Sequence, residues 1–246
     1  MIPHIIHQSW KTKQIPASLR EFQNSWHIHH PNWECRLWTD EDNQRLIDDE
    51  YPQFAAFYRQ LPIPVLKIDF VRLAYLHRFG GLYVDLDFEA LRGLDPLLNE
   101  SRIVVGRETG GIGNAMRGSD FILNALIASP CGHPVWLEVM QQMAATFRPR
   151  RLLEPKAFYV IRMTVQIFDQ VMEAYQKNHD DITIHPHEVF YPASPAERLV
   201  ATRRALARSC GAFAIHHYEN TWFGRWNKLI NAALRRWQLW KALRQG

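Results

Sequence analysis

The sequence predicts an α/β fold in which a mixed, mainly parallel central sheet is flanked by helices. Two patterns lead to this prediction. Short apolar segments typical of strands alternate with helical patterns along residues 1–90, and alternation of this kind favours layered α/β architectures. One predicted strand also runs into a pair of acidic residues, and ligands in such folds bind at the carboxyl ends of strands. We therefore expect the functional residues at that edge of the sheet.

Composition indicates a folded domain. The chain has 246 residues, of which 47% are hydrophobic and 22% charged, which are ordinary globular values. Three cysteines without a Cys-x-x-Cys pair suggest neither a disulfide framework nor a thiolate zinc site, and they favour a reducing compartment. Residues 2–10 are typical of a short strand and not of a signal peptide. We expect a cytoplasmic protein with one domain, 1–222, followed by a helix over 223–246.

The first elements follow from periodicity and capping. The apolar run Ile2–Ile6 predicts a buried strand, and a helical pattern covers residues 17–30 before Pro31. Residues 34–38 alternate as a second strand. Thr39 is then a suitable N-cap, because three acidic residues follow it in the first helical turn.

The next helix is predicted over residues 64–79, where apolar side chains recur at helical spacing. Gly80 and Gly81 end this helix and open the strand that carries the acidic pair. The later elements that we predict are a strand at 102–106, helices at 120–129, 134–147 and 158–177, and a short strand at 212–217. The glycine-rich segment 109–114 either lines a site or forms a plain surface turn.

The acidic pair is Asp85 and Asp87. On an extended strand these two carboxylates and Tyr83 share one face, because Leu82, Val84 and Leu86 alternate with them. Residues i and i+2 of a strand lie roughly 6.6 Å apart. Two ionised carboxylates at that separation repel each other unless a cation or a proton lies between them.

Three interpretations of the pair are open. Hard carboxylate oxygens suit Mg²⁺ or Mn²⁺, and a substrate diphosphate with water completes the coordination. A glycosidase pair would have to lie on both sides of a sugar, whereas neighbours on one strand face the same way. Solvated acids on a sheet edge are the third interpretation. The Gly-Gly turn and the intervening aliphatic residues favour the metal site.

Asp69 and Arg72 lie three residues apart on the predicted helix that precedes the strand, and hence on one face. One interpretation is a surface ion pair, worth under about 1 kcal/mol. In the other, Arg72 binds a phosphate and Asp69 accepts hydrogen bonds from sugar hydroxyls. Spacing alone leaves both interpretations open.

The segments Lys67–Arg72 (KIDFVR), Tyr75–Leu76 and Phe79–Asp87 (FGGLYVDLD) resemble the DXD-containing sugar-binding region of glycosyltransferase family 32. Other blocks extend the resemblance over nearly the whole chain. They are Ile2–Trp10, Pro31–Glu34, Leu37–Trp38, Asn124–Pro134, Ala214–His217 and Thr221–Trp222.

The resemblance implies a GT-A-type, Rossmann-like fold that binds a UDP- or GDP-sugar together with Mn²⁺ or Mg²⁺. It implies transfer, with retention, of a hexose or N-acetylhexosamine to a glycan or lipid-linked acceptor. Asp85 and Asp87 are the catalytic acids, with Asp87 as the direct metal ligand and Asp85 as its supporting partner. The substrate-binding residues that it implies are Trp10, Asp69, Arg72, Tyr83, Asn124 and Trp222.

The resemblance also implies a third metal ligand from the C-terminal region, where His216 and His217 are the candidates. Alternation on the predicted strand puts their imidazoles on opposite faces, so at most one can reach the metal. The motif favours His216.

The segment 223–246 is basic and rich in tryptophan. Residues 201–246 hold 9 Lys and Arg against one acid, whereas residues 1–200 hold 20 against 24. Because the excess positive charge belongs to the tail, nucleic-acid binding is not expected. The tail is typical of an amphipathic helix, which either lies on an anionic membrane at its inner face or packs on its own domain.

Two alternative functions remain. One is a Mg²⁺-dependent phosphatase of the haloacid dehalogenase type, which also places Asp-x-Asp after an apolar strand. That family has Thr or Val two residues after the second Asp, whereas Glu89 stands there in this chain. The other is a non-catalytic module that binds nucleotide sugars or glycans.

Overall fold

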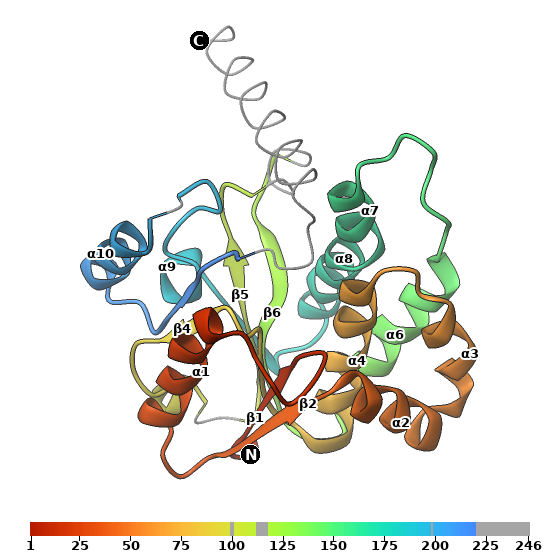
Figure 1. Cartoon of the computed structure of the whole chain (residues 1–246), viewed down its shortest axis with the longest axis horizontal. Coiled ribbons are helices and arrows are strands. Elements are labelled where there is room, and N and C mark those ends of the chain that lie inside the picture. The colour runs from red at the N-terminus through yellow and green to blue at the C-terminus, as the bar shows by residue number, and fades with distance from the viewer. Residues whose placement is uncertain (99–100, 112–117, 198, 220–246) are drawn as a thin grey trace, which may run out of the picture.

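The computed structural model describes residues 1–98, 101–111, 118–197 and 199–219. Within these ranges a six-stranded sheet crosses the molecule and has helices on both faces (Figure 1). Its strand order is β2-β1-β3-β6-β5-β7, and a two-stranded sheet pairs β4 with β8. The strands are β1 (Ile5–Ser9), β2 (Glu34–Trp38), β3 (Gly81–Val84), β4 (Phe88–Ala90), β5 (Ile103–Glu108), β6 (Phe121–Ser129), β7 (Ile182–His185) and β8 (Ala214–His216).

The main sheet is mixed and mainly parallel, as the sequence predicts. Strand β1 pairs in parallel with β2 and with β3, and β5 pairs in parallel with β7. Strand β6 runs antiparallel to both of its neighbours, β3 and β5. The parallel strands β1 and β3 therefore end at the same edge of the sheet.

Side chains alternate between two apolar cores, one on each face of the sheet. Along β3, Tyr83 joins one core while Leu82 and Val84 join the other. The first core is closed by α2 (Asp40–Glu50), α3 (Pro52–Gln60), α4 (Pro64–Phe79), α6 (Val135–Thr146), α7 (Lys156–Met163) and α8 (Val165–Gln176). The second is covered by α1 (Ala17–His29), α9 (His187–Phe190) and the small sheet, with α10 (Val200–Cys210) beyond (Figure 1). A short 3-10 turn, η1, covers Asp95–Leu97.

Several predicted elements are confirmed. The helices expected over 17–30, 64–79 and 134–147 are α1, α4 and α6, and the strand expected over 34–38 is β2. Thr39 caps α2 through a reciprocal capping box: its hydroxyl accepts from the Asp42 N–H, and the Asp42 carboxylate accepts from the Thr39 N–H. Among the described residues, every helix is too short or too polar to cross a membrane.

Other predictions are wrong. The first strand is Ile5–Ser9, later than the predicted Ile2–Ile6. Residues 121–129 form the central strand β6 and no helix; all nine are buried, so both faces of the strand are apolar and the period-2 signal is lost. The helix predicted over 158–177 is two helices that meet at Thr164. Strand β4, α3, β7, α9 and α10 have no counterpart in the predictions.

The turn at Gly80 and Gly81 is the one that the sequence predicts. Both glycines have positive φ, +64° and +89°, a region that residues with a Cβ rarely adopt. A Cβ on Gly81 would lie 2.5 Å from the carbonyl oxygen of Ile5 on the paired strand β1. The chain therefore passes directly from the end of α4 into β3.

Candidate functional site

A cavity of about 430 Å³ opens at the edge where β1 and β3 end. Its walls come from the ends of these strands, from β6 and from helices α4 and α7. The structure brings eight of the predicted site residues to this cavity: Trp10, Asp69, Arg72, Tyr83, Asp85, Asp87, Asn124 and His216.

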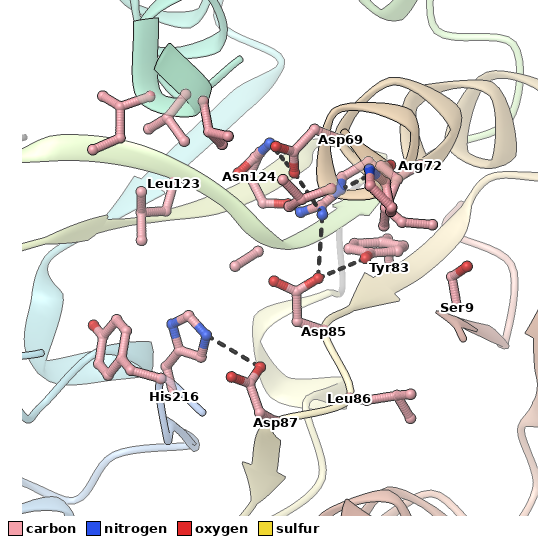
Figure 2. Close-up of a pocket in the computed structure, with 18 of the residues that line it drawn as sticks. Ser9, Asp69, Arg72, Tyr83, Asp85, Leu86, Asp87, Leu123, Asn124 and His216 are labelled. Atoms are coloured by element: carbon pink, nitrogen blue, oxygen red, sulfur yellow. Dashed lines mark hydrogen bonds and ion pairs between the residues drawn. The ribbon is translucent and has the colours of Figure 1, made fainter. Parts of the chain in front are cut away.

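The acidic pair does not lie on the strand itself, in contrast to the prediction. Strand β3 ends at Val84, and the N–H of Phe88 donates to the carbonyl of Asp85 at 3.0 Å, which closes a tight turn. Asp85 and Asp87 both lie in this turn between β3 and β4 (Figure 2). The turn, and not strand alternation, presents both carboxylates to the cavity.

Asp87 is held from the C-terminal strand β8. The Nε2 of His216 lies 3.2 Å from Oδ1 of Asp87 (Figure 2). The backbone N–H of Glu219 donates to Oδ2 at 2.9 Å. Segments about 130 residues apart along the chain therefore meet at this one carboxylate.

His217 faces away from the cavity. Its Nε2 lies 2.8 Å from Oε2 of Glu89, and its ring stacks on Phe22 with centroids 4.1 Å apart. Arg204 holds the same Glu89 carboxylate at 2.9 and 3.0 Å. The two neighbouring imidazoles point to opposite sides of β8, as the alternation of the sequence predicts.

Asp85, Asp87 and His216 are a candidate centre for a divalent cation. One ligand atom from each side chain lies within 4.8 Å of the others. Two carboxylate oxygens and one imidazole nitrogen are donors that suit Mn²⁺, and with more oxygen ligands Mg²⁺. The Nδ1 of His216 is buried and has no hydrogen-bond partner among the described residues. The donor chemistry of the cluster fits such an ion.

Asp85 is held from the helix side of the cavity. Its Oδ1 accepts from the hydroxyl of Tyr83 at 2.6 Å and lies 3.3 Å from a guanidinium nitrogen of Arg72. The same guanidinium lies over the Tyr83 ring, 4.4 Å from its centroid. Burial raises the pKa of Tyr83 well above its ordinary value, so its hydroxyl remains a donor to Asp85.

Asp69 and Arg72 form a buried pair, so the interpretation as a surface ion pair is wrong. Their side chains are almost fully buried, with a guanidinium nitrogen 2.7 Å from Oδ1 of Asp69. Arg72 also donates to the backbone carbonyl of Asn124 at 2.5 Å, and the Asn124 amide donates to Asp69 at 3.1 Å (Figure 2). One connected network thus joins α4, β6 and the acidic turn.

The pKa values of the three candidate ligands shift in the directions that crowded charges produce. Burial, together with the neighbouring charge of Asp87, raises the pKa of Asp85. Burial also opposes ionisation of Asp87, but His216 and the hydrogen bonds that Asp87 accepts hold its pKa below the ordinary value. Burial opposes protonation of His216, and Asp87 outweighs it, so the pKa of His216 rises.

Some expectations lie outside the described residues. Trp222 and the segment 223–246 belong to this group, as do residues 112–114 of the glycine-rich segment. Other cavity residues have no counterpart in the predictions, notably Ser9, Glu108, Leu123 and Tyr218. Glu108 ends β5, so the rule that ligands bind at strand ends would have found it. Tyr218 follows the histidine pair and has φ +53°, which nothing in the sequence indicates.

Comparison with known proteins agrees with this geometry. Residues 16–104, which include the acidic turn and the Asp69/Arg72 helix, match the family model described as the glycosyltransferase sugar-binding region containing a DXD motif. The chain belongs to this family. The match supports the resemblance to glycosyltransferase family 32.

Curated relatives of this chain include fungal mannosyltransferases. The inositol phosphoceramide mannosyltransferase 3 of Schizosaccharomyces pombe is 34% identical over 192 residues, which cover 72% of this chain and 52% of that protein. A mannosyl phosphorylinositol ceramide synthase of Saccharomyces cerevisiae is 36% identical over 51% of this chain and 34% of that protein. The chain thus spans about half the length of the first relative and a third of the second.

Solved structures show the same fold. The PaToxG glycosyltransferase superimposes with a TM-score of 0.52 at 17% identity, over 72% of this chain and 70% of that chain. The UDP-bound glycosyltransferase domain of the YGT toxin gives 0.54 at 8% identity, over 74% and 79%. The fold is therefore of the GT-A type, as the resemblance implies. Fold and family together favour a glycosyltransferase over a haloacid dehalogenase-type phosphatase.

Proposed function

We propose that this chain is a metal-dependent, retaining glycosyltransferase. It moves a hexose or N-acetylhexosamine from a nucleoside diphosphate sugar to a glycan or lipid-linked acceptor. The single observation that carries this proposal is the convergence of Asp85, Asp87 and His216 in the cavity, with ligand atoms within 4.8 Å. The names of the fungal relatives make mannose the first sugar to test and a phosphoinositol-bearing lipid the first acceptor.

Asp87, Asp85 and His216 would hold the ion, Mn²⁺ or Mg²⁺. A bound divalent cation supplies electrostatic stabilisation of the negative charge that develops on the departing diphosphate. Different side chains and backbone groups of the chain hold the two acids in place. His216 and the Glu219 N–H hold Asp87, while Tyr83 and Arg72 hold Asp85.

The donor is proposed to lie along the wall formed by α4 and β6. Asp69 and Asn124 have oxygen and amide groups for sugar hydroxyls, and the charge of Arg72 lies beside them. Trp10 is half-buried just beyond β1 and lines the cavity, so its ring face is suited to stack on the nucleotide base. Trp222 is proposed as a further substrate contact from the family resemblance alone.

We also retain the proposal that residues 1–222 form the transferase domain and that 223–246 form a basic amphipathic helix. Its charge and tryptophans suit an anionic membrane at the cytoplasmic face. Removing residues 225–246 should reduce co-sedimentation of the protein with anionic liposomes. Unchanged sedimentation would contradict this membrane role.

The test of the function is release of nucleoside diphosphate from a panel of UDP- and GDP-sugars, with and without Mn²⁺. One donor should support release that depends on Mn²⁺, and the same donor with Mn²⁺ should raise the melting temperature. A non-catalytic binding module would show the stabilisation without turnover. Absence of both effects for every donor would refute the proposal.

A further inference from the structure

The loop between α6 and α7, residues 147–155, exposes two adjacent leucines. Leu152 is 94% exposed and Leu153 is 91% exposed, and the loop arcs outward from the body of the molecule (Figure 1). Other strongly exposed apolar residues, such as Ile28 at 71% and Leu199 at 67%, stand singly, which is normal for soluble surfaces. Two adjacent leucines in one loop that are both almost fully exposed form a continuous apolar surface, and such a surface indicates a binding partner.

Positive charge surrounds this pair. Arg148, Arg150 and Arg151 precede the leucines directly. The guanidiniums of the first two donate to backbone carbonyls, of Phe147 at 2.7 Å and of Glu154 at 3.1 Å, so these bonds do not neutralise their charge. The single acid of the loop, Glu154, is held by Arg162 at 2.9 and 3.0 Å. The loop is therefore both apolar and cationic.

A hollow at the base of the loop offers groups that fit an anion. Its lining residues are Gln60, Pro62, Ile63, Phe147, Pro149, Arg150, Lys156 and Tyr159. Tyr159 is fully buried as a residue, and its hydroxyl has no hydrogen-bond partner among the described residues. A buried hydroxyl without a partner is costly, and two cations with an O–H donor suit a phosphate group.

The hollow adjoins the catalytic cavity. Lys156 lines both, and Ala157 and Val160 of the same helix, α7, line the cavity. A lipid whose phosphate occupies the hollow therefore has the rest of its headgroup within reach of the cavity. Its acyl chains would extend toward Leu152 and Leu153.

We propose that the loop 147–155 and this hollow dock on a bilayer of anionic phospholipid. The two leucines enter the apolar layer, the arginines lie among the headgroups, and Arg150, Lys156 and Tyr159 hold one lipid phosphate. Apolar insertion combined with basic residues is the combination that gives reversible binding to anionic surfaces. The presentation of a membrane-borne acceptor to the cavity rests on the proposed function, whereas the docking itself does not.

Hydrogen–deuterium exchange of the full chain tests the docking, because it separates the loop from residues 223–246. Phosphatidylcholine vesicles containing phosphatidylglycerol at a ratio of about 2:1 supply the anionic charge, and pure phosphatidylcholine vesicles are the comparison. With the anionic vesicles, the amides of residues 150–153 should exchange at least about tenfold more slowly than in the chain without vesicles. With pure phosphatidylcholine vesicles they should show no such slowing. The double substitution Leu152→Ser/Leu153→Ser should abolish this protection. The matched control, Ile28→Ser/Leu199→Ser, should retain it.

Tyr159→Phe tests the hollow, since it removes the hydroxyl and keeps the ring. It should weaken vesicle protection around residues 156–159 and leave the melting temperature unchanged or higher. Equal protection of those residues by inorganic phosphate without vesicles would overturn the assignment to a bilayer. Protection that rises with protein concentration in the absence of vesicles would also overturn this assignment, because it indicates contact with a second copy of the chain.

Unprotected loop amides on a chain that co-sediments with the vesicles would overturn the proposal as well. Failure of the proposed function is recognised separately. If the transferase proposal holds, Leu152→Ser/Leu153→Ser should release nucleoside diphosphate at the normal rate and lose transfer to a vesicle-borne acceptor. If no donor turns over, the vesicle measurement still decides the docking.

Discussion

The Nε2 of His217 lies 2.8 Å from Oε2 of Glu89, while that of its neighbour His216 lies 3.2 Å from Oδ1 of Asp87. Two adjacent imidazoles, one on the last residue of β8 and one on the residue after it, thus each hold one acid at or beside β4. The N–H of His217 also donates to the carbonyl of Asp87 at 2.9 Å. Glu89 and His217 therefore fix the position of β8 relative to the acidic turn and act as positioning residues for the candidate metal centre.

Replacing Glu89 with alanine should raise the Kd for Mn²⁺ of the substrate-free protein by about tenfold, within the range known for groups that orient metal ligands. The change acts through β8, because Glu89 does not touch the three candidate ligands. Electron paramagnetic resonance of free Mn²⁺ measures the Kd. Glu89→Gln keeps an oxygen that accepts from His217 and should restore part of the affinity. An unaltered Kd in a folded Glu89→Ala protein would contradict the positioning role.

Asp87→Asn should abolish the Mn²⁺-dependent release of nucleoside diphosphate and leave the fold intact. Asparagine keeps the shape of the side chain but removes the charge that faces His216 and the proposed cation. Turnover and a thermal melt are the two measurements. Asp49→Asn is the matched control, since Asp49 is an exposed acid on α2, and it should leave turnover unchanged. Wild-type turnover in Asp87→Asn would refute the site assignment.

Asp69→Ala should lower the free energy of unfolding by about 3 kcal/mol, because it leaves a buried arginine without its nearest acidic partner. The pair is almost fully buried at 2.7 Å, and Asp85 at 3.3 Å compensates the charge only in part. Urea unfolding measures the loss. Arg45→Ala removes an exposed ion pair and should cost under about 1 kcal/mol. Equal small costs for both variants would show that the buried network contributes little stability.

His7 should make stability depend on pH. Trp38 donates its indole N–H to Nδ1 at 3.1 Å, so Nε2 carries the proton and donates to the Gly80 carbonyl at 2.9 Å. Burial lowers the pKa of His7 to about 4 from 6.5. The unfolded chain therefore binds a proton between these two values that the folded chain does not.

The contribution of His7 is thus complete above pH 6.5 and is lost as the pH falls toward 4, by about 3 kcal/mol in total. Urea unfolding at a series of pH values measures the slope. His7→Gln should remove that part of it, and His4→Gln, at an exposed position, should not. Identical slopes in His7→Gln and the parent chain would contradict this origin of the pH dependence.

The residues that the sequence identified best are those whose local signal is strong. The helix 64–79 has clear helical spacing and a double-glycine stop, and its bounds are those of α4. Strand β6 shows the opposite case. Its residues are buried on both faces, so the strand period disappears, and a single sequence does not distinguish it from a buried helix.

The candidate site shows the same difference between what local sequence indicates and what only the fold reveals. The residue types and their spacing were enough to select Asp85 and Asp87, because like charges so close along the chain need compensating partners, whereas Asp69 and Arg72 were selected through the family resemblance. The identity of those partners came only from the fold. The burial of the Asp69–Arg72 pair and the separate contacts of His216 with Asp87 and of His217 with Glu89 all depend on contacts between distant segments.

The sequence by itself determined the α/β class and singled out the acidic pair as a candidate cation site. These follow from periodicity, from charge and from the donor preferences of cations, which act within a few residues of the chain. Tertiary structure alone decided which side chains share the cavity and which only support it. It also placed the leucine pair of the 147–155 loop on the surface, since burial is a property of packing and not of any one segment.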